Sequence, residues 1–454
     1  MPADLQRRMA ELPFRELYEV GGSLRDELLG REPKDVDFLV RGHGVEELLA
    51  LCRRYGRADE LRVAGRLVGV RFWPPWGPRE GIEIVPPRRE TPILEGEPGY
   101  SGNPHTDFRI EPDPDLPVRD DLERRDFTVN AMARDVRTQE WIDPFGGRED
   151  LHARLLRAVH PAAFRDDPLR ILRGVARCSL DGLSPDAPTR ELMTTAAPRI
   201  AELSAERVRE ELDRTLAGPG AADAMRLARD VGALAVAVPE WAACIGLDQQ
   251  SATQAYTLDE HILHVLDAAV GDDAAREPRL AAFWHDVGKP HAPGPRPHAE
   301  AGARITRGAL RRLTYDNDTV ARVSELVREH SYSEDREPSA HSARLFLARV
   351  GRERARDLLA LRRWDRLGRG VTIPAEDVAA RELFEALVEQ EWAQPVALSD
   401  LAVRGDDLVA AGLSEGPAIG ETLRRLLAAV VDDPSLNQRA TLLRLAAEAP
   451  RAIE

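Results

Sequence analysis

The segment Tyr18–Val40, YEVGGSLRDELLGREPKDVDFLV, restricts the possible folds of this chain more than any other part of the sequence. It begins in a short apolar strand that ends at Gly21 and Gly22. Ser23 is placed to be the N-cap of a helix, with Asp26 three residues on as in a weak capping box. The buried face of that helix is predicted to hold three leucines, Leu24, Leu28 and Leu29. A unit of this kind predicts mixed α and β structure.

Two carboxylates follow this helix. The chain re-extends after a turn at 30–34, and alternation along a strand puts Asp35 and Asp37 on one face. Glycines let a backbone approach phosphate closely, a helix N-terminus attracts anions, and paired carboxylates hold cations that bridge phosphates. Taken singly, Gly-Gly is commonly only a tight turn and Asp-x-Asp is commonly solvated. Found together, they favour a site for a nucleotide triphosphate and a metal.

The strings GGSLRD and KDVDF resemble the signature of the poly(A) polymerase/tRNA nucleotidyltransferase family, which includes the class II CCA-adding enzymes. The resemblance implies that Asp35 and Asp37 are catalytic and hold two Mg²⁺ ions. One ion would lower the pKa of an RNA 3′-hydroxyl, and the other would neutralise the departing pyrophosphate. It also implies that Gly21, Gly22 and Arg25 cradle the triphosphate.

Length and cysteine content suit a multi-domain protein of a reducing compartment. At 454 residues the chain exceeds one ordinary core, and roughly two to four domains are expected. The three cysteines are far apart and form neither a disulfide framework nor a cysteine zinc site. The N-terminus carries no apolar signal region, and no apolar stretch is long enough to span a membrane. We therefore expect a cytoplasmic protein with no membrane partner.

The distribution of charge matters more than its total. A net charge of −15 argues against a nucleic-acid partner, but binding depends on where the basic groups lie. Only two of the 63 basic residues are lysines. Lys34 lies beside the aspartate pair and Lys289 lies in a His-Asp motif described below. The placement of both lysines at candidate sites mildly favours a function for each.

Further strands are expected in the same N-terminal region. Arg62–Phe72 and Gly81–Val85 are the candidates, and Glu83 in the second is the natural third carboxylate for the metal, with an ordinary surface charge as the alternative. The polar segment Thr91–Leu122 is rich in Pro and Gly, which predicts a long irregular loop.

The segment LERRDFTVNAMARD, Leu122–Asp135, contains two adjacent arginines before an acid. The residues alone are compatible with a surface patch. The segment resembles the RRD motif of the same family, which implies that Arg124, Arg125 and Asp126 hold the ribose and the triphosphate. Trp141–Gly147 resembles the turn that closes the family's catalytic head.

Beyond Arg148 the pattern becomes helical, and one helix carries an arginine face. Pro168 suits a first helical turn, with two aspartates at its positive end. Gly174 inside this helix should cost about 1 kcal/mol against Ala, with no reason visible in the sequence. The arginines fall at positions i, i+3 and i+7, Arg170, Arg173 and Arg177, and the predicted buried side consists of Leu169, Leu172 and Ala176.

Asp167 and Arg170 could read the edge of a nucleobase. Cytosine and adenine both present an amino donor beside a ring-nitrogen acceptor, which an aspartate and an arginine match. Uracil and guanine would leave buried acceptors opposed, which costs roughly 1–3 kcal/mol for each unpaired group. DDPLR resembles the base-selecting motif of class II CCA-adding enzymes, with Asp166 where Glu is common. The resemblance also places Arg173 and Arg177 in the nucleotide pocket.

A second constellation of histidines and aspartates begins after Tyr256. A lone His-Asp pair is usually accidental, but an ordered set with helical flanks resembles the HD superfamily of metal-dependent phosphohydrolases. This resemblance implies a ligand set of His261, His285, Asp286, His298, His330 and Asp365. Nitrogen and oxygen donors suit Mn²⁺, Ni²⁺ or another divalent transition metal as well as Mg²⁺, and a metal-bound water would attack phosphorus. A decayed domain that only binds is the alternative.

The sequence thus predicts an α+β protein, with a mixed-sheet nucleotidyltransferase head followed by all-α regions. The expected domains are the head at 1–147, a helical neck and body at 148–250, an HD domain at 251–370 and a helical C-terminal region at 371–454. The expected function is addition of CCA, or part of it, to tRNA 3′ ends from CTP and ATP, with HD hydrolysis of a 2′,3′-cyclic or terminal phosphate.

Several alternatives share these motifs. A poly(A) polymerase, a CC-adding enzyme and an A-adding enzyme would carry the same head. A protein-modifying nucleotidyltransferase, or an HD hydrolase with the head as an RNA-binding module, belongs to another class of function.

Overall fold

The computed structural model describes residues 3–33, 36–63, 65–93, 96–97, 108–292, 295–331 and 337–448. The chain forms two compact units, Met1–Ala242 with Ala309–Tyr315, and Ala243–Gly308 with Asp316–Glu454. The first unit contains the predicted head and most of the predicted neck and body, and the second contains the C-terminal region and the predicted HD domain except for residues 309–315. The finer division into four domains stays a prediction.

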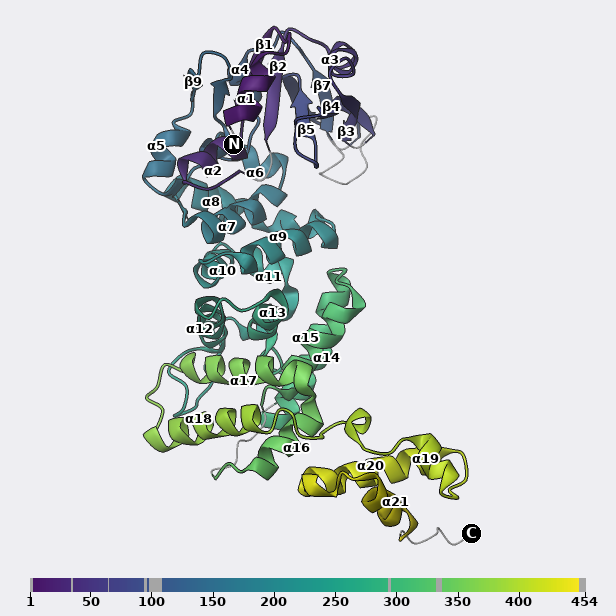
Figure 1. Ribbon diagram of the computed structural model, residues 1–454. Helices are drawn as coiled ribbons and strands as arrows, with labels where there is room; N and C mark the ends of the chain where they lie inside the picture. The colour runs from purple at the N-terminus through teal and green to yellow at the C-terminus, as the bar shows by residue number, and fades with distance from the viewer. Residues whose placement is uncertain are drawn as a thin grey trace. The chain divides into compact units, whose positions relative to one another are not determined.

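A seven-stranded mixed sheet forms the N-terminal part of the first unit, with strand order β3-β4-β5-β2-β1-β8-β9 (Figure 1). Strands β2 and β5 pair in parallel, whereas the other neighbours are antiparallel. The strands are β1 (Glu16–Val20), β2 (Asp37–Arg41), β3 (Arg57–Val63), β4 (Arg66–Trp73), β5 (Ile82–Val85), β8 (Ala133–Asp135) and β9 (Trp141–Ile142). The α+β prediction for this region is confirmed.

Each face of the sheet is covered by different elements. Phe38 and its neighbours pack with α1 (Ala3–Ala10) and α3 (Val45–Cys52) on one face. Leu39 packs on the other face with α4 (Val118–Glu123) and with residues after the 3₁₀ turn η1 (Thr128–Asn130). Because side chains alternate along a strand, Asp37 lies on the same face as Leu39. The sheet therefore turns Asp37 towards the side on which α4 lies.

Four local expectations were wrong or only partly right. Arg62–Phe72 is not one strand, because it contains the end of β3, a hairpin turn in which Gly65 takes a φ of 77°, and most of β4. Helix α2 (Gly22–Leu28) begins at Gly22 with no side-chain cap, so Ser23 is buried inside the helix and is not its N-cap. Of the three leucines only Leu24 is buried, because the helix ends at Leu28.

The fourth concerns the predicted loop Thr91–Leu122, which contains the strand β7 (Phe108–Pro112) and the start of α4. Strand β7 pairs with β6 (Arg88–Pro92) in a separate two-stranded sheet. The sequence of β6, RRETP, has no alternation in hydropathy that could reveal a strand, whereas β7, FRIEP, does alternate and is a signal that the sequence analysis missed.

The rest of the first unit is helical except for the short parallel pair of β10 (Leu155–Leu156) with β11 (Ser184–Pro185). Helix α7 packs on α9 and α10, and Gly174 lies where α7 approaches Phe127: a Cβ there would lie 2.8 Å from the ring atom Cζ. The glycine left unexplained by the sequence is thus a packing requirement. The helices are α5 (Gly147–His152), α6 (Ala163–Asp166), α7 (Leu169–Asp181), α8 (Ala187–Ala196), α9 (Ala205–Ala217), α10 (Ala221–Asp230) and α11 (Ala233–Ala237).

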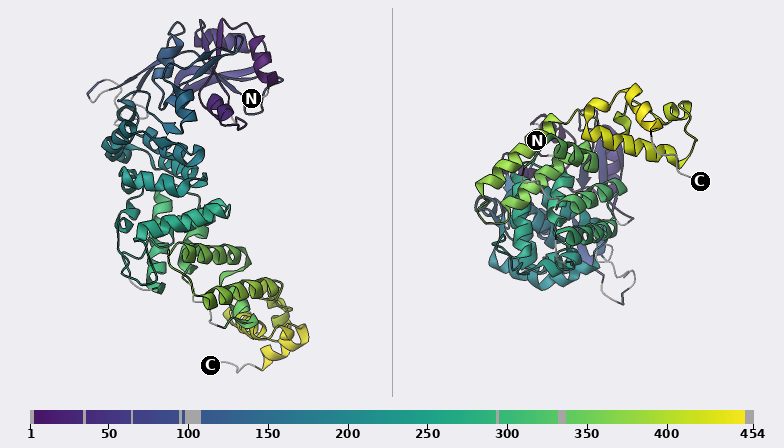
Figure 2. Two further views of the ribbon diagram at one scale, coloured as in Figure 1. Left: turned by 90° about the vertical axis from the view of Figure 1, so that its left-hand side faces the viewer. Right: turned by 90° about the horizontal axis from the view of Figure 1, so that it is seen from below.

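The second unit is built from helices throughout its described residues (Figure 2). Helix α12 packs on α13 and α17, which buries the segments that carry the predicted HD residues. The helices are α12 (Leu258–Gly271), α13 (Arg276–Trp284), α14 (Pro295–Arg312, whose last turn belongs to the first unit), α15 (Asn317–Glu329), α16 (Ala340–Val350), α17 (Arg352–Leu367), α18 (Ala375–Gln390), α19 (Gly405–Ala410), α20 (Pro417–Asp432) and α21 (Arg439–Ala447).

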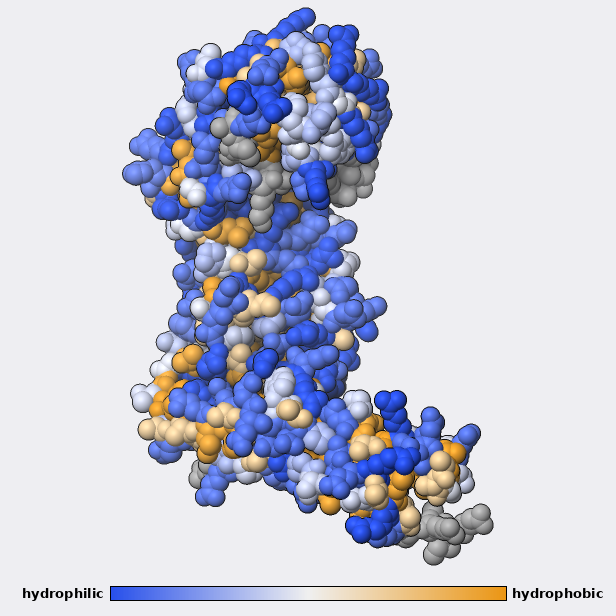
Figure 3. Space-filling model, viewed as in Figure 1, coloured by the Kyte–Doolittle hydropathy of each residue, from blue (hydrophilic) through white to orange (hydrophobic). Residues whose placement is uncertain are grey.

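Hydrophilic residues cover most of the face drawn in Figure 3, and hydrophobic ones gather over α17 and α18. Leu367 and Leu383, which belong to these helices, are 59% and 50% exposed. Among the described residues, no helix combines the length and the apolar character needed to cross a bilayer.

Candidate functional site

A cavity of about 1320 Å³ in the first unit brings together most of the head and neck residues predicted from the sequence. Gly21 is not among the lining residues, and Asp35 lies outside the described residues. The predicted residues that line the cavity are Gly22, Arg25, Asp37, Glu83, Arg124, Arg125, Asp126, Asp167, Arg170, Arg173 and Arg177. Segments from 22 to 177 thus meet at one place.

The glycine turn orients two arginines. Gly21 has a φ of 81°, and a Cβ at this position would lie 2.6 Å from Nη1 of Arg125. Arg125 in turn donates to the carbonyl of Asn130. Arg25, one turn into α2, donates to Oδ1 of Asn130 at 2.5 Å and to Asp26 at 2.7 Å. The turn therefore needs glycine both for its backbone angle and for the space that Arg125 occupies.

Asp37 and Glu83 are direct partners in the parallel register of β2 and β5. Neighbouring residues in register point to the same face, so both carboxylates face the cavity. The Glu83 carboxylate forms an ion pair with Arg71. Oxygen donors of this kind are the ligands that Mg²⁺ prefers, and the two side chains fit the metal that the sequence predicted.

The first RRD arginine is held by two acids that the sequence analysis missed. Arg124 contacts Oε1 of Glu90 and Oδ1 of Asp121, both at 2.9 Å. Burial raises the pKa of Asp121, but Arg124 and Arg125 outweigh it and hold the pKa below its ordinary value. The i, i+3 spacing of Asp121 and Arg124 is a signal that could have revealed this pair. Glu90 comes from β6 and left no such local signal.

Asp126 is buried and fully engaged. Its Oδ1 accepts from the amide of Phe127 at 2.8 Å and from Nδ2 of Asn130 at 2.9 Å, and its Oδ2 lies 2.9 Å from Nη2 of Arg173. Burial raises the pKa of Asp126, but Arg173 and the hydrogen bond from Asn130 outweigh it. Asp126 therefore stays ionised and joins the RRD segment to α7.

The predicted base-reading pair lies at the start of α7. Asp167 accepts from the amide of Leu169 at 3.0 Å, and its Oδ2 lies 3.7 Å from Nη2 of Arg207. Arg170 donates to the carbonyl of Arg124 at 2.7 Å, which ties the pair to the RRD segment. Arg207 belongs to α9 and lines the same cavity, but its distance along the chain left no signal for its role.

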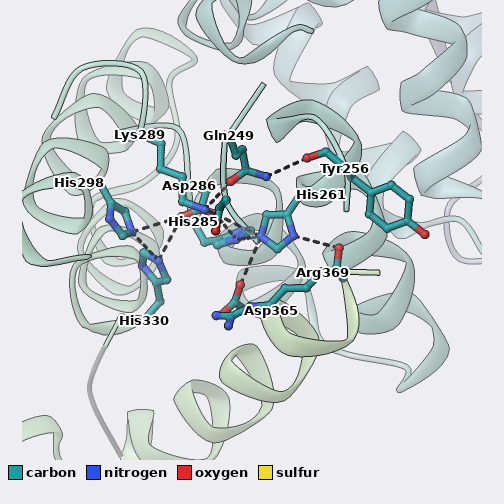
Figure 4. A network of polar contacts seen from close by, with 12 residues as sticks. Gln249, Tyr256, His261, His285, Asp286, Lys289, His298, His330, Asp365 and Arg369 are labelled. Atoms are coloured by element: carbon teal, nitrogen blue, oxygen red, sulfur yellow. Dashed lines mark hydrogen bonds and ion pairs between the residues drawn. The ribbon is translucent and has the colours of Figure 1, made fainter. Parts of the chain in front are cut away.

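The six predicted HD residues converge in the second unit (Figure 4). They form two groups that share one carboxylate, that of Asp286, and all six are buried. The first group is His261, His285, Asp286 and Asp365, and the second is Asp286, His298 and His330. The histidine Nε2 atoms lie 3.2–3.4 Å from the Asp286 oxygens.

Backbone hydrogen bonds orient three of these imidazoles. Nδ1 of His261 contacts the carbonyl of Gly368 at 3.0 Å, Nδ1 of His285 that of Ala282 at 2.8 Å, and Nδ1 of His330 that of Val327 at 2.6 Å. A carbonyl only accepts, so Nδ1 carries the proton in each ring. The Nε2 atoms of the three rings therefore face the shared carboxylate, which is the orientation of metal-ligating histidines.

The charges around Asp286 keep it ionised. Burial would raise its pKa, but His285 and Lys289 hold it well below its ordinary value. Burial lowers the pKa of His261, but Asp286 and Asp365 raise it to about 9, so His261 must release a proton when it binds a metal. Lys289 lies 2.6 Å from Asp286 and donates to Gln249. These six side chains fit a divalent metal.

Comparison with known proteins gives concordant matches. Residues 17–157 match the model described as "Poly A polymerase head domain". Residues 182–245 match "Probable RNA and SrmB- binding site of polymerase A", and residues 304–446 match "tRNA nucleotidyltransferase domain 2 putative".

The "Multifunctional CCA protein" of Ectopseudomonas mendocina is 35% identical over 69% of this chain and 74% of its own length. The "CC-adding tRNA nucleotidyltransferase" of Thermus thermophilus is 34% identical over 92% of this chain and 91% of its own. The crystal structure of the Bacillus stearothermophilus CCA-adding enzyme with CTP has a similar fold, with a TM-score of 0.68 at 24% identity over 98% of this chain and 96% of that one.

Proposed function

The chain belongs to the tRNA nucleotidyltransferase family, and from this premise we propose that it adds C and A residues to the 3′ end of tRNA, with CTP and ATP as substrates. The observation that carries the proposal is the single cavity that joins the Asp37–Glu83 pair, the glycine turn and the Asp167–Arg170 pair. Full CCA addition is the proposed product, and CC addition is the alternative, because relatives of both kinds match.

The arginines would bind the triphosphate. Arg25 and Arg125 flank the glycine turn, and guanidinium groups form bidentate hydrogen bonds with phosphate oxygens. Arg124 is already oriented by Glu90 and Asp121, so little conformational entropy is lost when the nucleotide binds.

Base selection would fall to Asp167 and Arg170. The Asp167 carboxylate accepts from an exocyclic amino group, and Arg170 donates to the adjacent ring nitrogen. A uracil or guanine carbonyl facing Asp167 leaves two acceptors opposed, at a cost of about 1–3 kcal/mol. This pairing explains how one site could accept both C and A.

The family implies a divalent metal, for which Mg²⁺ is the proposed ion. Asp37, Glu83 and Asp35 would hold it, and it would supply activation of the RNA 3′-hydroxyl and neutralisation of the pyrophosphate. The role of the protein's own residues is to hold the α-phosphate and the hydroxyl in line.

Incubation of the protein with tRNA that lacks its 3′-terminal CCA tests the proposal. CTP alone should add two residues, and CTP with ATP should add three. Addition that stops after CC would assign the CC-adding alternative, and no use of CTP would contradict the proposal. Asp37→Ala should abolish addition, whereas Asp115→Ala, at an exposed position remote from the lining residues, should retain it.

A second activity is favoured by the arrangement around Asp286. We infer a metal-dependent phosphohydrolase that acts on a 2′,3′-cyclic or terminal phosphate, with Mn²⁺ or Ni²⁺ as candidate metals. Four buried imidazoles converge with their Nε2 atoms on one buried carboxylate. Buried polar groups gathered in this way are costly unless they bind a partner, which supports a working site over a decayed one.

Hydrolysis of 2′,3′-cyclic AMP in the presence of Mn²⁺ tests this activity. His285→Ala should abolish it and a chelator should remove it, because both take away the metal that activates water. The exposed His341 provides the control, since His341→Ala should hydrolyse as wild type does. Activity that survives His285→Ala would contradict the assignment.

A further inference from the structure

The buried carboxylate of Asp181 lines the nucleotide cavity, but no role has been assigned to it so far. Asp181 is the last residue of α7, where the negative end of the helix disfavours an acid, and its side chain is fully buried. Three guanidinium groups compensate: Arg31 at 2.5 Å, Arg177 at 3.2 Å and Arg25 at 3.5 Å. A carboxylate in so unfavourable a position with three cationic partners is a structural junction.

Arg31 also forms a hydrogen bond to the backbone at the C-terminal end of α7. Its Nη2 donates to the carbonyl of Leu180 at 2.8 Å, while Nη1 contacts Asp181. The last carbonyl groups of a helix lack hydrogen-bond donors within the helix, and Arg31 supplies a donor for the carbonyl of Leu180. Arg154 supplies a donor for the carbonyl of Asp181, at 2.9 Å.

Two of the partners of Asp181 belong to the part of the chain that leads to Asp37. Arg25 belongs to α2 after the glycine turn, and Arg31 belongs to the segment between α2 and the strand that begins with Asp37. The other end of α7 follows Asp167 and carries Arg170. One helix of about 20 Å thus joins the segment that leads to Asp37 with the base-reading pair.

We propose that Asp181 is a positioning residue, which through Arg31 and Arg25 fixes the metal-binding segment relative to the residues that read the base. This inference rests on the proposed nucleotidyl transfer. An accepted nucleotide is held by its base near one end of α7 and reacts at its α-phosphate near Asp37, so the junction sets the alignment of phosphorus with the RNA hydroxyl.

Two variants test the role. Asp181→Asn removes the charge with little change in size, and Arg31→Gln does so at a side chain that is 46% exposed and so can be replaced without unfolding. In each, kcat for CMP addition to tRNA lacking CCA should fall about 10- to 100-fold, because small misplacements of reacting groups have effects of this size. The KM for CTP should change little, because the base-reading residues are intact.

The double variant should be no slower than the slower single variant, because both remove the same junction. Arg190→Gln is the matched control: it removes an exposed Arg190–Asp230 pair and should leave kcat unchanged. A raised KM with unchanged kcat would overturn the inference by making Arg31 a triphosphate ligand. Unchanged kcat with a lower melting temperature would overturn it by making the junction merely structural.

The inference and the function beneath it fail differently. A wild-type chain that adds no nucleotide would overturn the proposed function and the inference with it. An active wild type whose Asp181→Asn and Arg31→Gln variants are equally fast would overturn the inference alone.

Discussion

At the scale of single residues, the cavity is organised by charged side chains that pair with one another as well as by those that would meet substrate. Glu90 and Asp121 hold Arg124, Asp126 joins Arg173, and Asp181 joins Arg31. Each acid orients a guanidinium group and offsets its charge, which reduces the repulsion between the arginines that line the cavity. Removing an acid is therefore expected to affect both stability and the placement of its arginine.

Gly21→Ala should lower the free energy of unfolding by about 1–2 kcal/mol, because a Cβ is disfavoured at a φ of 81°. It should also raise the KM for CTP, because the new Cβ displaces Arg125. Gly30→Ala is the matched control, with a φ of 71° and no atom within 4 Å of the added Cβ. Urea unfolding and steady-state kinetics of both variants check this, and a KM raised equally in both would contradict the role of Arg125.

Asp121→Asn should lower the free energy of unfolding by about 3 kcal/mol at pH 7, because it removes the fully buried carboxylate that pairs with both Arg124 and Arg125 and leaves Arg124 with Glu90 alone. The pKa of Asp121 is lower in the folded chain than in the unfolded one. Its contribution is therefore fully present above the unfolded pKa of about 4 and is lost as the pH falls below that value.

Urea unfolding of wild type and Asp121→Asn at pH 7, 5 and 3.5 tests this. The difference in the free energy of unfolding between wild type and Asp121→Asn should be equal at pH 7 and pH 5 and smaller at pH 3.5. A difference that shrinks already between pH 7 and 5 would show that another group is responsible, and Asp115→Asn supplies the exposed control.

At the scale of elements, α7 is the part on which the site depends. It follows Asp167, carries Arg170 and Arg173 on one face, and buries Leu169, Leu172 and Ala176 on the other, as the spacing predicted. Its close contact with Phe127 sets its distance from the RRD segment. The arginine face therefore reaches the cavity only because one residue of the buried face has no side chain.

Gly174→Ala should destabilise the chain despite the better helix propensity of alanine. The gain of about 1 kcal/mol is outweighed by overpacking of about 1–3 kcal/mol, since the added Cβ would lie 2.8 Å from fully buried Phe127. Gly308→Ala in α14, with nothing within 4 Å, should instead stabilise the chain by roughly 1 kcal/mol. The melting temperature is expected to fall in Gly174→Ala and to rise in Gly308→Ala, relative to wild type. A Gly174→Ala variant that is more stable than wild type would contradict the packing explanation.

At the scale of the whole molecule, two compact units hold two separate clusters of functional groups. The nucleotide cavity lies entirely in the first unit, and the HD cluster lies entirely in the second. No residue is shared between the two clusters, so the two proposed activities should respond to different ligands and different variants.

Calorimetry should show this separation. Mn²⁺ at about 100 times its dissociation constant adds about 2.7 kcal/mol to the unit that binds it, which corresponds to a shift of roughly 5–10 °C for a unit of this size. His285→Ala should abolish that shift, and Asp37→Ala should leave it. CTP with Mg²⁺ should raise the transition of the first unit alone. A Mn²⁺ shift that survives in His285→Ala would contradict the assignment of the HD site.

The sequence by itself determined the chemistry and the order of the motifs. The Asp37 strand and the arginine face of α7 follow from local spacing, because side-chain direction repeats with the period of each element, whereas the set of histidines was predicted from a resemblance to a known superfamily. Residues whose role depends on partners far along the chain were missed: Glu90 and Arg207 carry no local signal, and Asp181 carries only its i, i+4 spacing from Arg177. Only the tertiary structure decided that Asp181 meets Arg31 and that Gly174 must make room for Phe127, since long-range contacts arise from packing, which no single stretch of sequence encodes.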